Sequence, residues 1–467
     1  MKPIRFGTDG WRAIIAKDFT FDRLSRVVEG TARWLLQKHS QPKVMVGYDC
    51  RFMAGKFAEA VAQHFAMRGI KVYISPSFAS TPMVSLATVQ HQAHLGIVLT
   101  ASHNPPEYLG YKVKASYGGP APVSLLKEIE ALIPDTPVEV PDRWETYLQQ
   151  RQIEIYDMES LYLNYMRSRF PLRDFQNLPY RIGFDAMYGA GQRIFPKLLP
   201  TVHAFRCEYN PSFGGVSPEP IPKNLGEFAH FMQEKNLDFA FILDGDADRI
   251  GMMGKDGRYI DAHHIILLML HYLIRYKGEK GRVILSLSCA TRVGEYARKA
   301  GLPVEITPVG FKYIAEKMEG SSDVLLGAEE SGGIALPSHL PERDGSFVAL
   351  TILQMLAETG KTLEQLIREI YESIGAFAVD RLDWHIPEER KQRTLQRLAT
   401  EPPKHFAGRS VQNIDRTDGY KLLLEGGEAV MLRASGTEPI LRIYSEAATA
   451  ERAQELITAS QEWVMQA

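Results

Sequence analysis

The chain has 467 residues, of which 45% are hydrophobic and 24% charged, and its formal net charge is -2. These values are typical of globular proteins and exclude disordered and collagen-like classes. Lys and Arg number 54 against 56 Asp and Glu, with no basic block, so no nucleic-acid partner is expected. At about 100–200 residues per domain, the length predicts three or four domains.

Nothing in the sequence indicates a disulfide framework, a zinc site or a membrane segment. The three cysteines are far apart and form no CxxC pair. The first residues contain no apolar signal segment, and the longest apolar stretch, 263–274, is interrupted by His271 and too short to span a bilayer. We therefore expect a reduced, cytoplasmic protein with no membrane partner, and a core helix at 263–274.

The first third of the chain predicts a strand–helix–strand unit after an initial helix. Apolar side chains recur at helical spacing over 21–36, with Thr20 available as N-cap. An apolar run at 44–46, a helical pattern that stops at Gly69, and a second run at 72–74 follow. This order is typical of a parallel sheet covered by helices.

The same rhythm recurs along the chain, and three apolar runs lead directly into polar loops. Further runs lie at 181–184, 239–243, 283–287 and 324–326. The loops are TASHNPP after Leu99, DGDADR after Leu243 and GAEESGG after Leu326. Because ligands collect beyond the carboxyl ends of strands in open parallel sheets, we expect the three loops to line one cleft.

Domain boundaries are predicted at the proline-rich segment 134–141, at the turn 255–258 and within 371–383. From about residue 374 the apolar runs are shorter. They end in an amphipathic helix that includes Ala453, Leu456, Ile457 and Val464. The last segment therefore indicates a different, α+β domain.

The DGDADR motif is the strongest local signal of chemistry. Asp244, Asp246 and Asp248 alternate along the backbone and so point to one side, where their carboxylates repel unless a hard cation such as Mg²⁺ lies among them. An EF-hand is excluded, because Arg249 and Lys255 occupy the positions of its glycine and glutamate. A phosphatase with Asp244 as nucleophile fits the local pattern equally well.

Two other loops have the chemistry of ligand binding. Arg433, Ser435, Gly436 and Thr437 combine a guanidinium, two hydroxyls and a flexible backbone, as a phosphate cradle does. A plain Ser-Gly-Thr turn is the alternative. The loop 327–333 supplies carboxylates and a hydroxyl that suit sugar hydroxyl groups.

Ser102, in TASHNPP, is ambiguous on local grounds. It does not lie in a G-x-S-x-G elbow, and neighbouring side chains on an extended chain point to opposite faces, so His103 is a poor base for it. The local pattern favours a polar turn before Pro105 over a nucleophile.

Taken together and in this order, FGTDGWR, TASHNPP, DGDADR, GAEESGG and RASGTEP resemble the motifs of the α-D-phosphohexomutases, the phosphoglucomutase and phosphomannomutase family. The resemblance covers essentially the whole chain, and it makes the phosphatase interpretation of Asp244 the weaker one. It implies a four-domain α/β protein around a central cleft, with three related mixed α/β domains and a C-terminal TATA-binding-protein-like α+β domain. The expected ranges are 1–148, 149–258, 259–372 and 373–467.

The resemblance also implies a role for each motif. Ser102 would be the phosphorylated serine, and Asp244, Asp246 and Asp248 would hold Mg²⁺ together with an oxygen of the phosphoserine. The other expected catalytic residues are Arg12, His103, Lys112 and Arg249. The expected substrate-binding residues are Thr307, Gly310, Lys312, Glu329, Ser331, Arg343, Arg433, Ser435, Gly436, Thr437 and Arg442.

The activity implied is that of a phosphoglucomutase. It would interconvert glucose 1-phosphate and glucose 6-phosphate, with glucose 1,6-bisphosphate as intermediate and activator, and it would also act on mannose phosphates. The run Glu329-Glu330-Ser331 resembles that of glucose-active members, whereas phosphoglucosamine mutases, the alternative, more often have Gln in its middle. An inactive sugar-phosphate-binding regulator is the alternative of another class. A monomer or a dimer is expected.

Two positions depart from the family pattern. Some relatives end the sugar loop with a histidine that serves as acid or base, but this chain has Gly333, which leaves His103 and Lys112 as candidates. The first motif has Asp9 where relatives often have serine, with no consequence visible in the sequence. We also expect the phosphate-binding domain to open and close about a hinge near 371–383.

Overall fold

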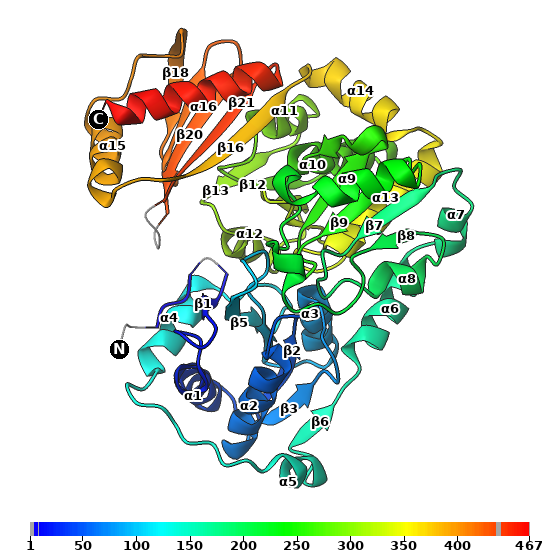
Figure 1. Cartoon of the computed structure of the whole chain (residues 1–467), viewed down its shortest axis with the longest axis vertical. Coiled ribbons are helices and arrows are strands. Elements are labelled where there is room, and N and C mark those ends of the chain that lie inside the picture. Colours follow the sequence, from blue (N-terminus) through cyan, green and yellow to red (C-terminus); the bar gives the residue numbers. More distant parts are fainter. Residues whose placement is uncertain (1–3, 8, 436–439, 467) are drawn as a thin grey trace. The chain divides into compact units, whose positions relative to one another are not determined.

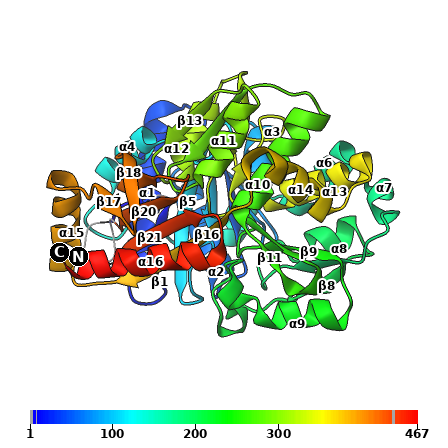
Figure 2. The same cartoon turned by 90° about the horizontal axis from the view of Figure 1, so that it is seen from above.

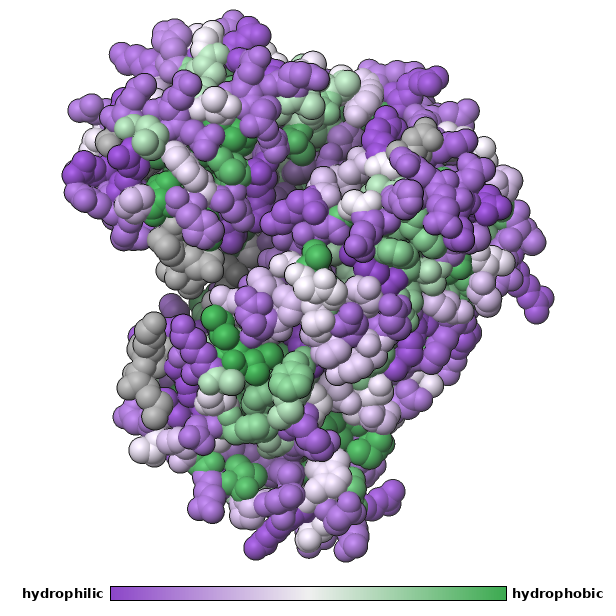
Figure 3. Space-filling model, viewed as in Figure 1, coloured by the Kyte–Doolittle hydropathy of each residue, from purple (hydrophilic) through white to green (hydrophobic). Residues whose placement is uncertain are grey.

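The structure is a computed structural model that describes residues 4–7, 9–435 and 440–466 (Figure 1). The chain forms two compact units. Unit 1 consists of Met1–Met269 and Gly310–Lys361, and unit 2 of Leu270–Val309 and Thr362–Ala467. Most of the face shown in Figure 3 is hydrophilic, and no helix in the described ranges is long and apolar enough to cross a membrane.

The first sheet of unit 1 has the strand order β1-β5-β4-β2-β3-β6. The pairs β2–β3, β2–β4 and β3–β6 are parallel, and β4–β5 and β1–β5 are antiparallel. Its strands are Trp11–Ile14 (β1), Lys43–Tyr48 (β2), Lys71–Ile74 (β3), Leu95–Leu99 (β4), Tyr108–Ala115 (β5) and Ile153–Ile155 (β6). Its helices are Phe21–Lys38 (α1), Ala54–Met67 (α2), Thr81–Gln90 (α3), Val123–Leu132 (α4) and Trp144–Gln149 (α5).

This part of the fold confirms the predicted strand–helix–strand unit. Thr20 caps α1, because its side chain accepts a hydrogen bond from the backbone N–H of Arg23. Helix α2 ends two residues before Gly69, whose φ of 77° is in the left-handed region that glycine adopts without strain.

Glycines on β2 and β4 allow α3 to approach the sheet. A Cβ at Gly47 would lie 2.4 Å from Val84, and a Cβ at Gly96 would lie 2.4 Å from Thr88, both on α3. Val44 and Val46 of β2 belong instead to the apolar core formed with α1 and α2. The two faces of the sheet thus carry different helices, and β4 is buried between them.

The second sheet of unit 1 repeats this plan with the order β11-β10-β9-β7-β8. β7 is parallel to β8 and β9, and β10 is antiparallel to β9 and β11. Its strands are Ile182–Asp185 (β7), His203–Phe205 (β8), Phe239–Leu243 (β9), Ile250–Gly254 (β10) and Tyr259–Ile260 (β11). The helices of this segment are Met158–Arg169 (α6), Leu172–Gln176 (α7), Ile194–Leu198 (α8) and Gly226–Glu234 (α9).

Residues 261–374 contribute to both units. Val324–Ala328 (β14) and Ile334–Ala335 (β15) form an antiparallel pair in unit 1, with Phe311–Met318 (α12) and Gly345–Thr359 (α13). Arg282–Ser286 (β12) and Val304–Thr307 (β13) form a parallel pair in unit 2, with Thr291–Lys299 (α11) and Leu363–Ile374 (α14). Ala262–His271 (α10) is the predicted core helix.

In unit 1 the three polar loops have the same structural setting. Each follows a buried strand and leads into an antiparallel neighbour: β4 into β5, β9 into β10, and β14 into β15. The loops therefore lie at the ends of buried strands, as the sequence predicted, but each turns back into an antiparallel strand, which it did not predict.

The C-terminal sheet of unit 2 is antiparallel throughout, in the order β16-β21-β20-β19-β18-β17. Its strands are Ala378–His385 (β16), His405–Phe406 (β17), Arg409–Asp415 (β18), Tyr420–Leu424 (β19), Ala429–Ala434 (β20) and Ile440–Ala447 (β21). Glu388–Thr400 (α15) and Ala450–Met465 (α16) accompany them, and α16 lies across the sheet (Figures 1 and 2). This is the α+β arrangement predicted for the last segment.

Buried hydrogen bonds join this sheet to the segment 282–309 of unit 2. Glu446 of β21 accepts hydrogen bonds from two backbone N–H groups in the first turn of α11, at 2.6 and 3.0 Å. Lys421 of β19 donates to the carbonyls of Leu287 and Cys289 at 3.0 and 2.6 Å. An apolar cluster adds to these contacts and consists of Leu287, Val309, Met431 and Tyr444.

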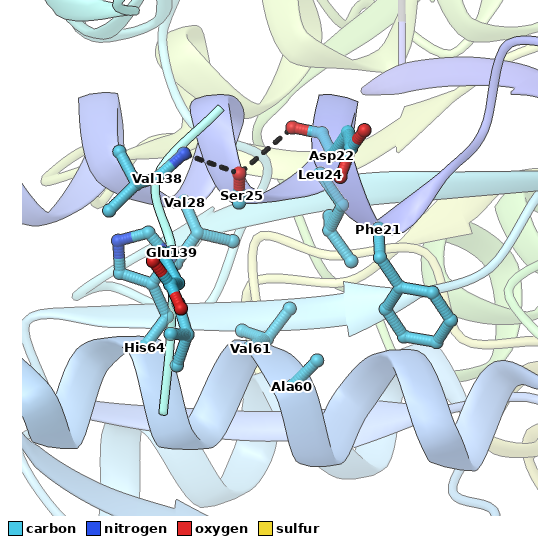
Figure 4. A pocket seen from close by; sticks show the side chains of 11 residues that line it. Phe21, Asp22, Leu24, Ser25, Val28, Ala60, Val61, His64, Val138 and Glu139 are labelled. Atoms are coloured by element: carbon cyan, nitrogen blue, oxygen red, sulfur yellow. Dashed lines mark hydrogen bonds between the residues drawn. The ribbon is translucent and has the colours of Figure 1, made fainter. Parts of the chain in front are cut away.

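A cavity of about 300 Å³ lies between α1, α2 and the segment 138–140 (Figure 4). Its wall is fixed by Ser25, whose hydroxyl accepts a hydrogen bond from Val138 and donates one to the Asp22 carbonyl. None of the residues described as its lining is a predicted site residue.

Candidate active site

Ser102 lies in the loop between β4 and β5 and is fully buried. Its Oγ donates a hydrogen bond to Asp244 Oδ2 at 2.8 Å, and its backbone N–H donates to Thr100 Oγ1 at 2.9 Å. Its φ of 53° is in the left-handed region, which a residue with a Cβ adopts where surrounding contacts enforce it. The loop thus presents the serine hydroxyl directly to the first aspartate of DGDADR.

Arg51 fixes the conformation of the serine loop. Its buried side chain pairs with Asp49, with Nε 3.1 Å from Oδ2. Its guanidinium also donates at 2.6–3.0 Å to four loop carbonyls, those of Ser102, Asn104, Pro105 and Tyr108. Because buried carbonyls are costly to leave unpaired, these bonds stabilise the strained turn at Ser102.

Asp244, Asp246 and Asp248 meet as their spacing predicted. All three are fully buried, and one oxygen of each lies within 4.8 Å of the others. Burial and the two neighbouring carboxylates raise the pKa of Asp244 well above its usual value. Asp246 Oδ1 and Asp248 Oδ1 are buried and have no hydrogen-bond partner among the described residues. Unpaired carboxylate oxygens at this spacing fit a hard divalent cation such as Mg²⁺.

Protein groups hold the other oxygens of this trio. Lys112 Nζ lies 2.7 Å from Asp246 Oδ2 and 3.1 Å from Asp248 Oδ2, and Thr81 Oγ1 also donates to Asp246 Oδ2. Burial alone would lower the pKa of Lys112, but Asp246, Asp248 and Asp9 raise it. Asp246 and Asp248 thus each have one oxygen held by the protein and one left for a ligand.

Asp9 joins three cations of the site. Its Oδ2 lies 2.8 Å from Arg12 Nη2, 2.7 Å from Lys112 Nζ and 3.0 Å from Arg343 Nη2. Burial favours the neutral acid, but Lys112, Arg343 and Arg12 hold the pKa of Asp9 well below its usual value. Asp9 is therefore an ionised carboxylate at the centre of a cluster of positive charge.

Arg12 and Arg343 link Asp9 to the two main loops. Arg12 Nη1 donates to Asn104 Oδ1 in the serine loop at 2.7 Å. Arg343 Nη2 donates to Asp248 Oδ2 at 2.6 Å. The three motifs that carry Asp9, Ser102 and the aspartates are thus one connected network within unit 1.

Arg249 and His103 are the remaining predicted catalytic residues. The backbone N–H of Arg249 donates to Asp244 Oδ1 at 3.0 Å, and its guanidinium Nε lies 3.9 Å from Asp248 Oδ1. His103 is half-buried, next to the fully buried Ser102. Unit 1 therefore brings all the predicted catalytic residues to one network or next to it.

The sugar loop places Glu329 at the end of β14. Its carboxylate accepts a hydrogen bond from the backbone N–H of Gly310 at 3.0 Å and lies 3.6 Å from Arg343 Nη1. Burial raises the pKa of Glu329 to about 7, although Arg343 opposes the shift. Ser331 follows on the loop and is half-buried.

Gly333, the departure from the family pattern, leaves space for Arg343. A Cβ at Gly333 would lie 2.4 Å from Arg343 Cδ, so a histidine there requires Arg343 to move. Lys312 lies in the same unit, with Nζ 3.3 Å from the Gly7 carbonyl, and burial lowers its pKa.

The predicted phosphate cradle lies in unit 2. Arg433 of β20 and Arg442 of β21 are directly opposite each other in the antiparallel pair, so both side chains share one face. Arg433 Nε donates to Asp418 Oδ2 at 2.9 Å, and Arg442 Nε lies 3.8 Å from Asp383 Oδ1. The two aspartates offset part of the repulsion between these like charges, and two guanidinium groups on one face are a donor set that also fits a phosphate.

Other predicted binding residues of unit 2 lie near strand ends. The backbone N–H of Ser435 donates to the Ile440 carbonyl at 2.9 Å, and Thr307 is the last residue of β13. Gly436 and Thr437 lie outside the described residues.

Sequence reasoning missed Arg51 and Thr81 and assigned no role to Asp9. Asp49 and Arg51 directly follow β2, as the predicted loops follow their strands, so their position was an available signal. Thr81 had no comparable signal, because its partner Asp246 is 165 residues away in the sequence.

A hydroxyl beside a carboxylate trio that fits a divalent cation, with fixed cations around it, is the arrangement that phosphoryl transfer requires. Fold and site together define an α/β enzyme of the phosphotransferase type.

Family models for the phosphoglucomutase/phosphomannomutase domains match the chain in order. Domain I matches residues 3–137, domain II 160–257, domain III 261–374 and the C-terminal domain 386–459. The chain belongs to this family, the α-D-phosphohexomutases, and is an enzyme that transfers phosphate intramolecularly.

Individual relatives match along nearly their whole length. A phosphoglucomutase/phosphomannomutase of Thermococcus kodakarensis is 29% identical, covering 97% of this chain and 96% of the relative. A phosphoglucosamine mutase of Caldicellulosiruptor bescii is 26% identical over 94% of each chain. The crystal structure of a protein described as a phosphomannomutase from Thermus thermophilus has a TM-score of 0.87, with 35% identity over 99% of each chain.

Proposed function

We propose that this phosphohexomutase interconverts glucose 1-phosphate and glucose 6-phosphate through a phosphoserine at Ser102, and that it also accepts mannose phosphates. The observation that carries the proposal is the 2.8 Å hydrogen bond from Ser102 Oγ to Asp244, beside two unpaired carboxylate oxygens. The Glu329-Glu330-Ser331 run supports glucose as the preferred sugar.

The reaction has two phosphoryl transfers. In the first, the bond between Ser102 Oγ and phosphorus breaks, a bond from phosphorus to O6 of glucose 1-phosphate forms, the O6 proton leaves, and Oγ regains a proton. Glucose 1,6-bisphosphate then turns over. In the second transfer the bond between O1 and phosphorus breaks, a bond from phosphorus to Ser102 Oγ forms, the Oγ proton leaves and O1 gains a proton, so that glucose 6-phosphate is released. Added bisphosphate activates the enzyme by phosphorylating Ser102. His103 and Lys112 are the candidates for the proton transfers.

The groups around Ser102 stabilise charge on the transferring phosphoryl group. Mg²⁺, held by the three aspartates and a phosphoserine oxygen, would supply Lewis-acid stabilisation of that charge. Arg12, Lys112 and Arg249 supply fixed positive charge that does not have to reorganise during the reaction.

The remaining residues hold the sugar and its second phosphate. Glu329 and Ser331 bind sugar hydroxyls, aided by Arg343. Thr307, Gly310 and Lys312 form the specificity loop, and Arg433, Ser435, Gly436, Thr437 and Arg442 bind the phosphate that is not transferred. A phosphate clamp made of residues other than those that surround Ser102 would hold the substrate so that the attacking hydroxyl is in line. The loops that carry Ser102, the aspartate trio, Glu329 and the phosphate-binding residues belong, in this order, to the proposed domains 1–148, 149–258, 259–372 and 373–467.

Phosphoglucosamine mutase is the second candidate, favoured by the Caldicellulosiruptor bescii relative. Assays of glucose 1-phosphate, mannose 1-phosphate and glucosamine 1-phosphate, each with its bisphosphate, separate the candidates. We expect the highest kcat/KM with glucose 1-phosphate. A higher value with glucosamine 1-phosphate would reverse the order.

Intact-mass measurement tests the phosphoserine itself. The wild-type chain should gain ~80 Da after incubation with glucose 1,6-bisphosphate. A chain that binds sugar phosphates but never gains this mass is an inactive binding protein, the alternative of another class.

A further inference from the structure

Asp9 has no role in the reaction as proposed, although it occupies the centre of the positive charge at the site. One oxygen, Oδ2, contacts Arg12, Lys112 and Arg343 within 3.0 Å. Gly10 makes this position possible, because a Cβ there would lie 2.7 Å from the Tyr111 carbonyl and 3.1 Å from Lys112 Cα. The backbone of the first motif therefore lies directly against β5, which carries Lys112.

The same three cations reach the surroundings of Ser102. Arg12 binds Asn104 of the serine loop. Lys112 contacts Asp246 and Asp248, and Arg343 contacts Asp248. Arg343 reaches this position because Gly333 leaves its space free. A phosphoryl group on Ser102 would therefore share cations with the Asp9 carboxylate.

We propose that Asp9 is a positioning residue that takes the place of the phosphoryl group while Ser102 is unphosphorylated, holding Arg12, Lys112 and Arg343 in position. The proposal rests on the function proposed for Ser102. When the phosphoryl group is present, it competes with a built-in carboxylate for the same cations. Asp9 thereby limits how tightly the site binds phosphate and keeps the phosphoryl group transferable.

The opposite expectation follows if Asp9 is only a structural partner of the cations. Without it, the three cations would lose the one partner that they share and spread apart, and the site would bind anions more weakly. The two interpretations thus predict opposite signs for the effect of Asp9→Asn on phosphate affinity, since this change removes the charge and keeps the shape.

The test is a calorimetric titration of the dephosphorylated, Mg²⁺-loaded enzyme with inorganic phosphate. We expect Asp9→Asn to bind phosphate about tenfold more tightly than wild type, a factor equivalent to about 1.4 kcal/mol. Asp9→Ser also removes the charge and should likewise bind phosphate more tightly. It replaces Asp9→Asn in the test if that variant fails to fold. Asp18→Asn, which removes a carboxylate paired with Arg23 at 2.8 Å, is the control and should match wild type. Unchanged or weaker binding by both Asp9 variants overturns the proposal.

A second measurement separates this proposal from the proposed function. The phosphoenzyme of Asp9→Asn, followed by intact mass, should transfer its group to glucose 1-phosphate more slowly, so that kcat falls while KM does not rise. If the wild-type chain never gains the phosphoryl mass, the function of Ser102 is wrong. If it gains the mass and Asp9→Asn transfers at the wild-type rate, only the role of Asp9 is wrong.

Discussion

In unit 1, Ser102 and the three aspartates are completely buried, whereas in unit 2 the side chains of Arg433 and Arg442 remain 14% and 28% exposed. In the buried centre, protein groups bind four of the six carboxylate oxygens of the trio, and only Asp246 Oδ1 and Asp248 Oδ1 have no hydrogen-bond partner among the described residues. In the arginine pair, each guanidinium has one aspartate neighbour, and both side chains share one face of a sheet. The difference suits their proposed tasks, because a reacting centre benefits from fixed charges, and a clamp must bind and release its phosphate.

Among the variants that test this comparison, Ser102→Ala has the largest expected effect. Loss of the proposed nucleophile should lower kcat by at least about a thousandfold and abolish the mass gain with glucose 1,6-bisphosphate. Ser116→Ala, an exposed serine just after β5, is the matched control and should behave as wild type. Mutase activity that survives Ser102→Ala would show that phosphate does not pass through this hydroxyl.

Asp248→Asn tests whether the buried trio holds a cation. The change removes the charge of a carboxylate whose Oδ1 has no hydrogen-bond partner among the described residues, so Mg²⁺ affinity should fall by at least about a hundredfold. Mg²⁺ at about 100 times its Kd should add about 2.7 kcal/mol to the unfolding free energy of wild type but much less to that of the variant, measured by urea denaturation. Asp238→Asn, whose carboxylate accepts from the backbone of Arg181, should respond as wild type does.

Glu329→Gln tests the cost of burial in unit 1. The pKa of Glu329 is about 7 in the folded protein and about 4.3 in an unfolded chain. Between these two pKa values the Glu329 carboxyl carries a proton in the folded state but not in the unfolded chain. The stability that this proton contributes is therefore greatest at low pH and is lost as the pH rises through about 7. From pH 5 to 8, the free energy of unfolding of wild type should therefore fall by about 2 kcal/mol more than that of the variant.

Urea denaturation at several pH values measures this loss. Glu234→Gln, an exposed glutamate beside Lys235, should retain the wild-type pH dependence. Parallel curves for wild type and Glu329→Gln would mean that Glu329 is ionised throughout.

Arg433→Lys is expected to have the smallest effect. Lysine keeps the charge but loses the planar fork that binds phosphate, so KM for glucose 1-phosphate should rise about tenfold while kcat changes less. Arg393→Lys, on the exposed side of α15, controls for the substitution. A fall in kcat with unchanged KM would place Arg433 in the reacting centre and remove the contrast between the two regions.

Local patterns predicted the elements that position the site, because those patterns report burial. The run 239–243 is β9, and the helical spacing from residue 21 is α1 with its predicted cap. The aspartate trio converges because alternation along one loop is a local property. The antiparallel returns β5 and β10 were not predicted, since strand direction depends on partners far along the chain.

Contacts between distant motifs were beyond local reasoning. The cluster on Asp9 joins residues 12, 112 and 343, and no spacing within the sequence encodes it. Ser102 is instructive, because the turn that local reasoning favoured is real, with a left-handed backbone. The turn and the proposed phosphoserine are therefore compatible, and only Asp244, 142 positions away, distinguishes this serine from an ordinary turn residue.

The contacts that Glu446 and Lys421 make with the segment 282–309 bear on how the enzyme moves. A rotation about residues 371–383 alone would break buried bonds to α11 and to the carbonyls of Leu287 and Cys289. The arginine pair is thus held to the same body as β12 and β13, and Thr307 at the end of β13 would follow any displacement of the proposed phosphate clamp.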